Sequence, residues 1–141
     1  MPADTSSAIP VIMNPVAHSA KAGDRLEEAP AYTLDTLAEP GNVRPRQIGG
    51  PIHVHPGGRF VYVANRADAT LDAGGAKVFG GGENNIAVFA IDPQTGEPRL
   101  LQHADTQSFH VRTFACDPSG RLLVAASIKQ HVLLGRGGVQ S

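Results

Sequence analysis

Residues 52–66 read IHVHPGGRFVYVANR, and a second stretch of similar form, FACDPSGRLLVAASIK, occupies residues 114–129. Each copy has an apolar segment, a turn built on proline and glycine, an arginine and a second apolar segment. A strand–turn–strand unit that recurs along a chain is typical of propellers and other stacked β architectures. When the two turns are superimposed, four pairs of residues align: His55 with Asp117, Pro56 with Pro118, Gly58 with Gly120, and Arg59 with Arg121.

The apolar segments around these turns are rich in Val, Ile, Phe and Tyr, which favours β-strands. A third turn is predicted from DPQTG at residues 92–96. In such a turn the Asp side chain accepts hydrogen bonds from the turn backbone, Pro fixes φ, and Gly adopts the left-handed conformation. We therefore predict four strands in the first unit, at residues 52–55, 60–65, 85–91 and 99–103. In the second unit we predict two strands, at residues 111–116 and 122–127, and the start of a third strand at residues 131–134.

These strands predict an all-β fold, an incomplete β-propeller with about one complete four-stranded blade and parts of its neighbours. Residues 49–106 form the complete blade, with a long glycine-rich insertion at 67–83 that we expect to be a flexible loop. Residues 107–141 form a partial next blade. Residues 1–48 are a poorly patterned arm, in which 31–34 can be an outer strand of a preceding blade. Because blades cover one another, such a chain exposes apolar faces, and we expect it to self-associate through them.

Composition narrows the classes of partner. The formal net charge of −1 gives no electrostatic reason to expect nucleic acid or an anionic membrane surface. No apolar run approaches the roughly 20 residues of a membrane helix, and we find no signal peptide at the N-terminus. One cysteine, Cys116, rules out an internal disulfide and fits a reducing compartment, so we expect a cytoplasmic protein.

Taken together, three segments resemble the seven-bladed β-propeller lactonases, a family that includes propeller-type 6-phosphogluconolactonases and carboxymuconate-lactonising cyclases. They are GPIHVHPGGRFVYVANR, NNIAVFAIDPQTGEPRLLQ and HVRTFACDPSGRLLVAAS. The resemblance covers residues 49 to 129 and implies a full-length molecule more than twice this size, of which this chain would be an inactive fragment. It also implies a substrate that is a small anionic lactone or sugar acid, such as 6-phosphogluconolactone, or a muconate. No cofactor and no metal are expected.

His110 and Arg112 are the candidate catalytic residues. They lie two apart on a predicted strand, at the end away from the hairpin turn, so we expect both side chains on one face. A histidine can activate water, and an arginine can hold an anionic group or a developing oxyanion. The resemblance matches Arg112 to the family's strand-entry arginine. The competing interpretation is a solvated histidine and an inter-blade salt bridge.

Asn65 and Arg66 are the candidate substrate-binding residues. They leave the second strand of the first repeat at the same end, and they resemble the family's Asn-Arg pair that borders the substrate mouth. Arg66 can bind an anionic group, or it can simply cap a loop. The insertion at 67–83 leaves from this end too and can lie over the mouth, although its glycines match no phosphate-binding fingerprint.

Two further features bear on function. His53 and His55 alternate on a strand, but no third ligand has a convincing spacing, so we assign them structural roles rather than a metal site. Pro51 stands where relatives often have a glutamate, which leaves the site without that acid or base. This departure favours the alternative function, a non-catalytic propeller that binds a ligand or serves as a scaffold.

Overall fold

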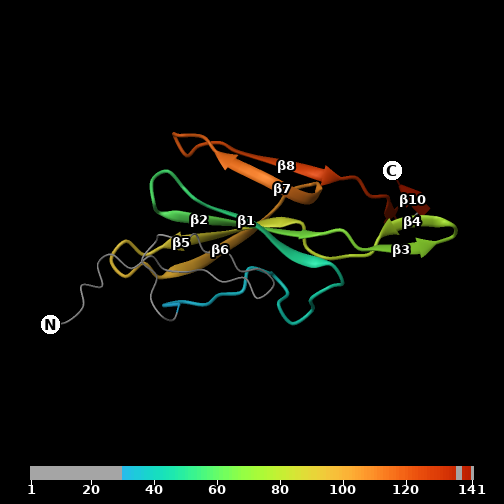
Figure 1. Ribbon diagram of the computed structural model, residues 1–141, viewed down its shortest axis with the longest axis horizontal. Coiled ribbons are helices and arrows are strands. Elements are labelled where there is room, and N and C mark those ends of the chain that lie inside the picture. Colours follow the sequence, from blue (N-terminus) through green and yellow to red (C-terminus); the bar gives the residue numbers. More distant parts are fainter. Residues whose placement is uncertain (1–29, 136–137, 141) are drawn as a thin grey trace.

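The computed structural model describes residues 30–135 and 138–140, and every regular element in this part of the chain is a β-strand (Figure 1). Four of these strands form one antiparallel sheet in the order β1-β2-β5-β6, which is the meander of a propeller blade. The other six form three two-stranded ladders. The four strands of the sheet are β1 (Gln47–Val54), β2 (Phe60–Ala67), β5 (Asn85–Ile91) and β6 (Pro98–Asp105); the pairs are β3 (Thr70–Ala73) with β4 (Ala76–Phe79), β7 (Phe109–Cys116) with β8 (Leu123–Lys129), and β9 (Leu133–Gly135) with β10 (Gly138–Gln140).

The predicted turns close the hairpins. In the first turn Gly58 has a φ of 70° and its N–H donates to the carbonyl of His55 at 2.7 Å. In the turn between β7 and β8, Gly120 has a φ of 71° and its N–H donates to the carbonyl of Asp117 at 2.8 Å. Both glycines occupy the left-handed region, which they adopt without the steric cost of a side chain. The repeat read from the sequence is therefore a repeat of structure.

The two central strands of the blade, β2 and β5, are buried on both faces, whereas β1 and β6 leave apolar side chains such as Val54 and Leu101 exposed. Alternate residues of β2 and β5 point to opposite sides of the sheet, as the two-residue period of a strand requires. On one side Ala64, Ile86 and Val88 pack against Val111 and Phe114 of β7. The other side is built from Val61, Val63, Ala87 and Phe89, and half-buried Leu34 from the segment before β1 packs on it. The β7–β8 hairpin and residues 30–37 thus cover opposite faces of the sheet (Figure 1).

His55 joins the two repeats at their turns. Its Nδ1 accepts a hydrogen bond from the N–H of Gly57, so the proton of the neutral ring is on Nε2. Nε2 lies 3.1 Å from the carbonyl oxygen of Gly120 and donates to it. His53 also serves packing, because its ring lies 4.6 Å from that of Phe114. Both histidines have the structural roles that the sequence predicted.

The prediction of a strand at residues 31–34 is wrong. This segment forms no ladder, and it lies across the sheet instead of extending it. The Tyr32 hydroxyl donates to the carbonyl of Thr95 at 3.2 Å, and Leu34 packs on the apolar face described above. Side-chain contacts rather than backbone pairing hold the segment on the blade.

Two predictions near the insertion are wrong in part, although a strand, β9, does form at Leu133–Gly135. Residues 67–83 are not a plain loop, because β3 and β4 pair across a turn at Gly74 and Gly75. The strand predicted at 131–134 does not extend the β7–β8 sheet; β9 pairs with β10, and the N–H of Phe79 in β4 donates to the carbonyl of Val132 at 2.9 Å. The rings of Phe79, Phe109 and His131 cluster beside this contact with centroids 4.7 to 5.5 Å apart.

Candidate functional site

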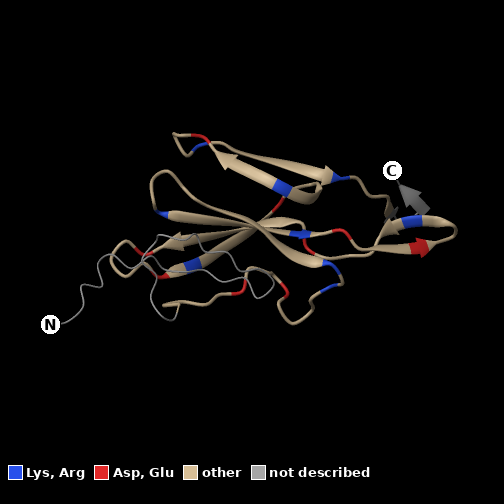
Figure 2. Cartoon of the chain, in the orientation of Figure 1, with Lys and Arg blue, Asp and Glu red and all other residues tan. Residues whose placement is uncertain are grey.

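The predicted site residues Asn65, Arg66, His110 and Arg112 lie at one end of the two blades. The turns that join β1 to β2, β5 to β6 and β7 to β8 lie at the opposite end, whereas Arg66 pairs with Ile48, Asn65 with Gly49, and Phe109 with Lys129 at this end. The end of β2, the start of β7 and the end of β8 therefore meet. Figure 2 shows basic positions in the loop before β1 and at this end of the β7–β8 hairpin. We call this region the open end.

His110 is buried and held in an unusual backbone conformation. Its side chain is 8% exposed, and its φ is 58°, a left-handed value that side chains rarely adopt. The backbone N–H donates to Oδ1 of Asn84 at 2.8 Å, which ties the residue to the start of β5. Burial, reinforced by the nearby charge of Arg66, lowers the pKa of His110 below its ordinary value. The imidazole is therefore neutral near neutral pH and able to accept a proton.

Arg112 does not share a regular strand face with His110, so this part of the sequence prediction is wrong. The β7–β8 register shifts between Val111 and Thr113, and Arg112 is the extra residue in this bulge. A bulge breaks the alternation of side chains and redirects the residue it contains. His110 is buried while Arg112 is exposed, but the two remain close enough for the charge of Arg112 to lower the pKa of His110 further.

Arg66 is half-buried between these groups. Its Nε donates to the carbonyl of Gly49 at 3.3 Å, which fixes the side chain beside the start of β1. Partial burial and then the charge of Arg112 lower the pKa of Arg66, while Asp68 acts in the opposite direction. Two guanidinium groups that repel each other in this way would be stabilised by an incoming anion.

Asn65 serves the fold. The side chain is fully buried; its Nδ2 donates to the Thr36 carbonyl at 2.5 Å and to Oδ1 of Asn85 at 2.9 Å. Its Oδ1 accepts from the Thr36 hydroxyl at 2.8 Å. These bonds anchor the segment before β1 to the blade. Contact between Asn65 and a substrate remains a prediction, which this geometry does not favour.

Asp68 lies at the centre of the open end, and the sequence analysis did not single it out. Its side chain is 4% exposed and accepts two hydrogen bonds from Arg46, at 2.5 Å from Nε and 2.9 Å from Nη2. Nζ of Lys129 and Nδ1 of His110 each lie 3.7 Å from Oδ2. The hydrogen bonds from Arg46 hold the pKa of Asp68 below its usual range.

The group of side chains around His110 consequently carries more basic than acidic side chains. Arg66, Arg112 and Lys129 lie near the imidazole, Arg46 and Lys129 lie near the Asp68 carboxylate, and Asp68 is the acidic group that faces the imidazole. A small phosphate or carboxylate would find several donors here that are not saturated by protein acceptors. The chemistry that this arrangement supports is anion binding next to a neutral imidazole base.

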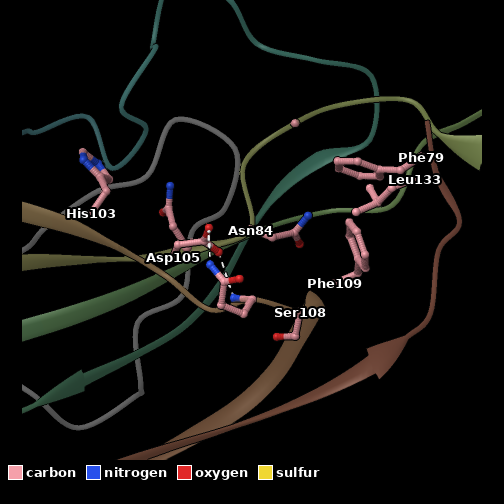
Figure 3. A pocket seen from close by; sticks show the side chains of 10 residues that line it. Phe79, Asn84, His103, Asp105, Ser108, Phe109 and Leu133 are labelled. Atoms are coloured by element: carbon pink, nitrogen blue, oxygen red, sulfur yellow. Dashed lines mark hydrogen bonds between the residues drawn. The ribbon is translucent and has the colours of Figure 1, made fainter. Parts of the chain in front are cut away.

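A pocket of about 420 Å³ lies beside this group (Figure 3). None of the four predicted site residues lines it in the part of the chain that the structure describes. Its polar side chains are largely engaged: Ser108 Oγ lies 2.6 Å from Ser127 Oγ, and the Asp105 carboxylate accepts from the backbone and side chain of Gln107 at 2.8 Å each. Phe79, Phe109 and Leu133 form its apolar wall. We therefore place the candidate site at the charged group rather than in this pocket.

Pro51 lies in a second irregularity, in the middle of β1. The β1–β2 register shifts between Gly49 and Ile52, so Gly50 and Pro51 make no regular ladder pairing. A proline at this position costs no ladder hydrogen bond. A side chain at Gly50 is excluded, since its Cβ would lie 2.9 Å from Cβ of Ala64.

Comparisons with known proteins agree with this architecture. The family model described as lactonase, seven-bladed β-propeller, matches residues 14–133. Proteins named 6-phosphogluconolactonase from Formosa agariphila and Bacillus subtilis are 34% and 33% identical over 91 and 90 residues, which is 64% of this chain in each case. The solved structure of the periplasmic gluconolactonase PpgL of Pseudomonas aeruginosa is similar over 79% of this chain, with a TM-score of 0.53 and 26% identity.

The matched part is a small share of each relative. The chain spans 22% of the Formosa and Bacillus proteins and 25% of the Pseudomonas structure. With four strands in one sheet and two in the next, the residues that the structure describes hold one complete blade and part of a second of such a propeller. No helix in the described residues is long and apolar enough to cross a membrane.

Proposed function

Because the chain belongs to the family of seven-bladed β-propeller lactonases, we propose that its open end forms part of a lactonase active site. In this proposal the complete propeller hydrolyses the lactone of a small anionic sugar acid. The observation that carries the proposal is the placement of neutral, buried His110 beside Arg66, Arg112 and Lys129. Base and anion-binding groups then come from two adjacent blades.

The chemistry follows from these groups. His110 takes a proton from water through Nε2 as the oxygen attacks the lactone carbonyl. Arg112, which is exposed, stabilises the negative charge that develops on the carbonyl oxygen. The ring C–O bond then breaks, and the proton returns from the imidazole to the leaving alkoxide. The lactone and one water become the open acid, and no cofactor takes part.

The substrate class rests on charge and on the named relatives. The basic side chains around His110 suit an anion, and the Formosa and Bacillus relatives carry the name 6-phosphogluconolactonase. We therefore take 6-phosphogluconolactone as the first substrate to test. An uncharged gluconolactone and a muconate lactone are the competing substrates, the former prompted by the name of the Pseudomonas protein.

The same reasoning leads to three narrower proposals. Residues 49–106 are one blade unit and residues 107–141 part of the next, with the arm before them as a separate region. The 141-residue chain by itself does not turn over lactone, because most of the channel wall of the propeller lies outside it. The protein is cytoplasmic, as its single cysteine favours, although the solved Pseudomonas relative is described as periplasmic.

The test compares Arg112→Gln with Arg99→Gln in the complete protein that carries these blades. Arg99 is also exposed, but it lies on β6 at the turn end of the sheet, so its loss changes net charge equally and leaves the open end intact. We expect kcat/KM for 6-phosphogluconolactone to fall about a hundredfold or more in Arg112→Gln and to change little in Arg99→Gln. Equal values for the two variants would remove Arg112 from the site.

The alternative function, a non-catalytic propeller, is favoured by Pro51 at the position of the family's glutamate. It predicts that 6-phosphogluconate binds at the open end and weakens in Arg112→Gln, while no lactone is hydrolysed. Calorimetry with the product, run beside the hydrolysis assay, separates the two functions.

A further inference from the structure

The Nδ1 atom of His110 has an unusual environment. It is buried and, within the described residues, it has no hydrogen-bond partner. Oδ2 of Asp68 lies 3.7 Å from this nitrogen, which is about 1 Å beyond a hydrogen bond to a charged oxygen. A buried polar atom without a hydrogen-bond partner destabilises the fold, so its presence here needs an explanation.

Backbone strain occurs at two residues beside the same carboxylate. Arg46 and His110 are both held at a φ of 58°, and both contact or face Asp68, whereas Gln107, with a φ of 51°, bonds Asp105 instead. Left-handed conformations of residues other than glycine persist where surrounding contacts fix them, and they gather at functional sites. Arg46 is 65% exposed, so burial of its side chain does not account for this conformation.

Asp68 is itself held firmly. The pair of hydrogen bonds from Arg46 restricts rotation of the carboxylate, and Oδ2 faces both Lys129 and His110. The charged groups around the imidazole are Arg66 from β2, Arg112 from β7, Lys129 from β8 and Asp68 from the segment after β2. Among these, Asp68 is the group that attracts a proton on Nδ1.

We propose that Asp68 is a positioning residue for His110: it keeps the proton of the neutral ring on Nδ1 and leaves Nε2 free to act on water. When Nε2 takes a proton from water, Nδ1–H and Asp68 close to hydrogen-bond distance and stabilise the imidazolium. When the imidazole returns its proton to the alkoxide, the pair opens again. This role rests on the proposed lactonase function, but the pairing itself does not.

The ring proton can be located directly. Nitrogen NMR of the full chain with ¹⁵N-labelled histidine distinguishes protonated from unprotonated ring nitrogens, and His110→Gln assigns the signal. We expect the Nδ1–H form in the wild type at neutral pH and loss of that preference in Asp68→Ala. Lys129→Gln removes a charge at the same 3.7 Å from Oδ2 and should keep the Nδ1–H form, which separates a directed contact from a change in local charge.

Two further variants serve as controls in case Asp68→Ala does not fold. Asp68→Asn keeps the shape of the side chain and an oxygen for Arg46, so it replaces Asp68→Ala if that variant does not fold; we expect it to weaken the Nδ1–H preference. Asp68→Glu should restore the preference at least in part. In the complete propeller we expect Asp68→Ala to lower kcat about tenfold or more with little change in KM, as loss of an orienting carboxylate does.

The outcomes are distinct. An Nε2–H ring in the wild type, or an Nδ1–H ring that persists in both Asp68→Ala and Asp68→Asn, overturns the inference. The expected NMR result together with a complete protein that hydrolyses no lactone supports the Asp68–His110 pair and overturns the proposed function. An unchanged kcat in Asp68→Ala, in a protein that does hydrolyse lactone, overturns the positioning role.

Discussion

Replacing Asn65 by alanine should destabilise the blade, because this side chain bonds the segment before β1 to the sheet. Three hydrogen bonds are lost, two to Thr36 and one to Asn85. Each is worth about 1 kcal/mol. The carbonyl of Thr36 keeps a second donor, since Nε2 of His103 lies 2.9 Å from it, and Asn85 is half-buried and can reach water.

The Thr36 hydroxyl has no such replacement. Thr36 is fully buried, and an unpaired buried hydroxyl costs about 1–3 kcal/mol. The sum of the lost bonds and this penalty, reduced by local relaxation, gives an expected destabilisation of about 2–4 kcal/mol. Exposed Asn42, whose amide bonds only the side chain of Glu39, is the matched control, and Asn42→Ala should cost less than about 0.5 kcal/mol.

Urea unfolding followed by circular dichroism measures both values. A cycle with Thr36→Val adds a second check, because a direct contact gives a coupling energy of about 0.5–3 kcal/mol. The reasoning is refuted if Asn65→Ala unfolds at the wild-type urea concentration. Weakened binding of 6-phosphogluconate in an Asn65→Ala protein of wild-type stability would instead support the substrate-binding prediction made from the sequence.

Three other perturbations test other parts of the structure. Hydrogen bonds from the Ser119 hydroxyl and then from the Leu122 backbone lower the pKa of Asp117 to about 2. The Asp117 carboxylate therefore stabilises the fold above its unfolded pKa of 3.8, and this stabilisation is lost as the pH falls toward 2. Asp117→Asn should consequently have a lower urea midpoint than the wild type at pH 5 and nearly the same midpoint at pH 2. Gly120→Ala should lower the free energy of unfolding clearly more than Gly58→Ala does. Both glycines have a φ near 70°, but only a Cβ at position 120 would meet the His55 ring, at 1.9 Å from Nε2. Equal free energies of unfolding for the two variants would contradict the contact between the turns. Val124 on β8 is 60% exposed, and we expect the chain to associate through such apolar side chains. Val124→Lys should therefore reduce the concentration-dependent association measured by sedimentation. A wild-type chain that sediments as a monomer at all concentrations would refute the expected association.

The strands and turns could be predicted because their signals are local. The third strand was predicted at residues 85–91, and the structure has β5 at Asn85–Ile91. Turns such as that at residues 55–58 combine proline, which fixes φ, with a glycine that can take a positive φ. Strand ends were less accurate: β1 starts at Gln47, five residues before the predicted start, because Gly49 and Gly50 hide the pattern.

The site could be predicted only in outline. His110 and Arg112 were identified, but the same-face geometry was wrong, since neither the positive φ of His110 nor the bulge at Arg112 has a signal in the residue types. Asp68 was missed because its partner Arg46 lies 22 residues away and Lys129 lies on another hairpin. The burial of Asn65 depends on Thr36, in a segment that the sequence pattern left uninterpreted.

The second hairpin is fastened to the first blade at each of its ends. At one end Nε2 of His55 bonds the carbonyl of Gly120. At the other end the insertion between β2 and β5 bonds a residue just past β8, because the N–H of Phe79 donates to the carbonyl of Val132. Because these two hydrogen bonds lie far apart, they restrict rotation of the β7–β8 hairpin relative to the first blade. The spacing between the backbones of Arg66 on β2 and Arg112 on β7 is consequently held by contacts on both sides of it.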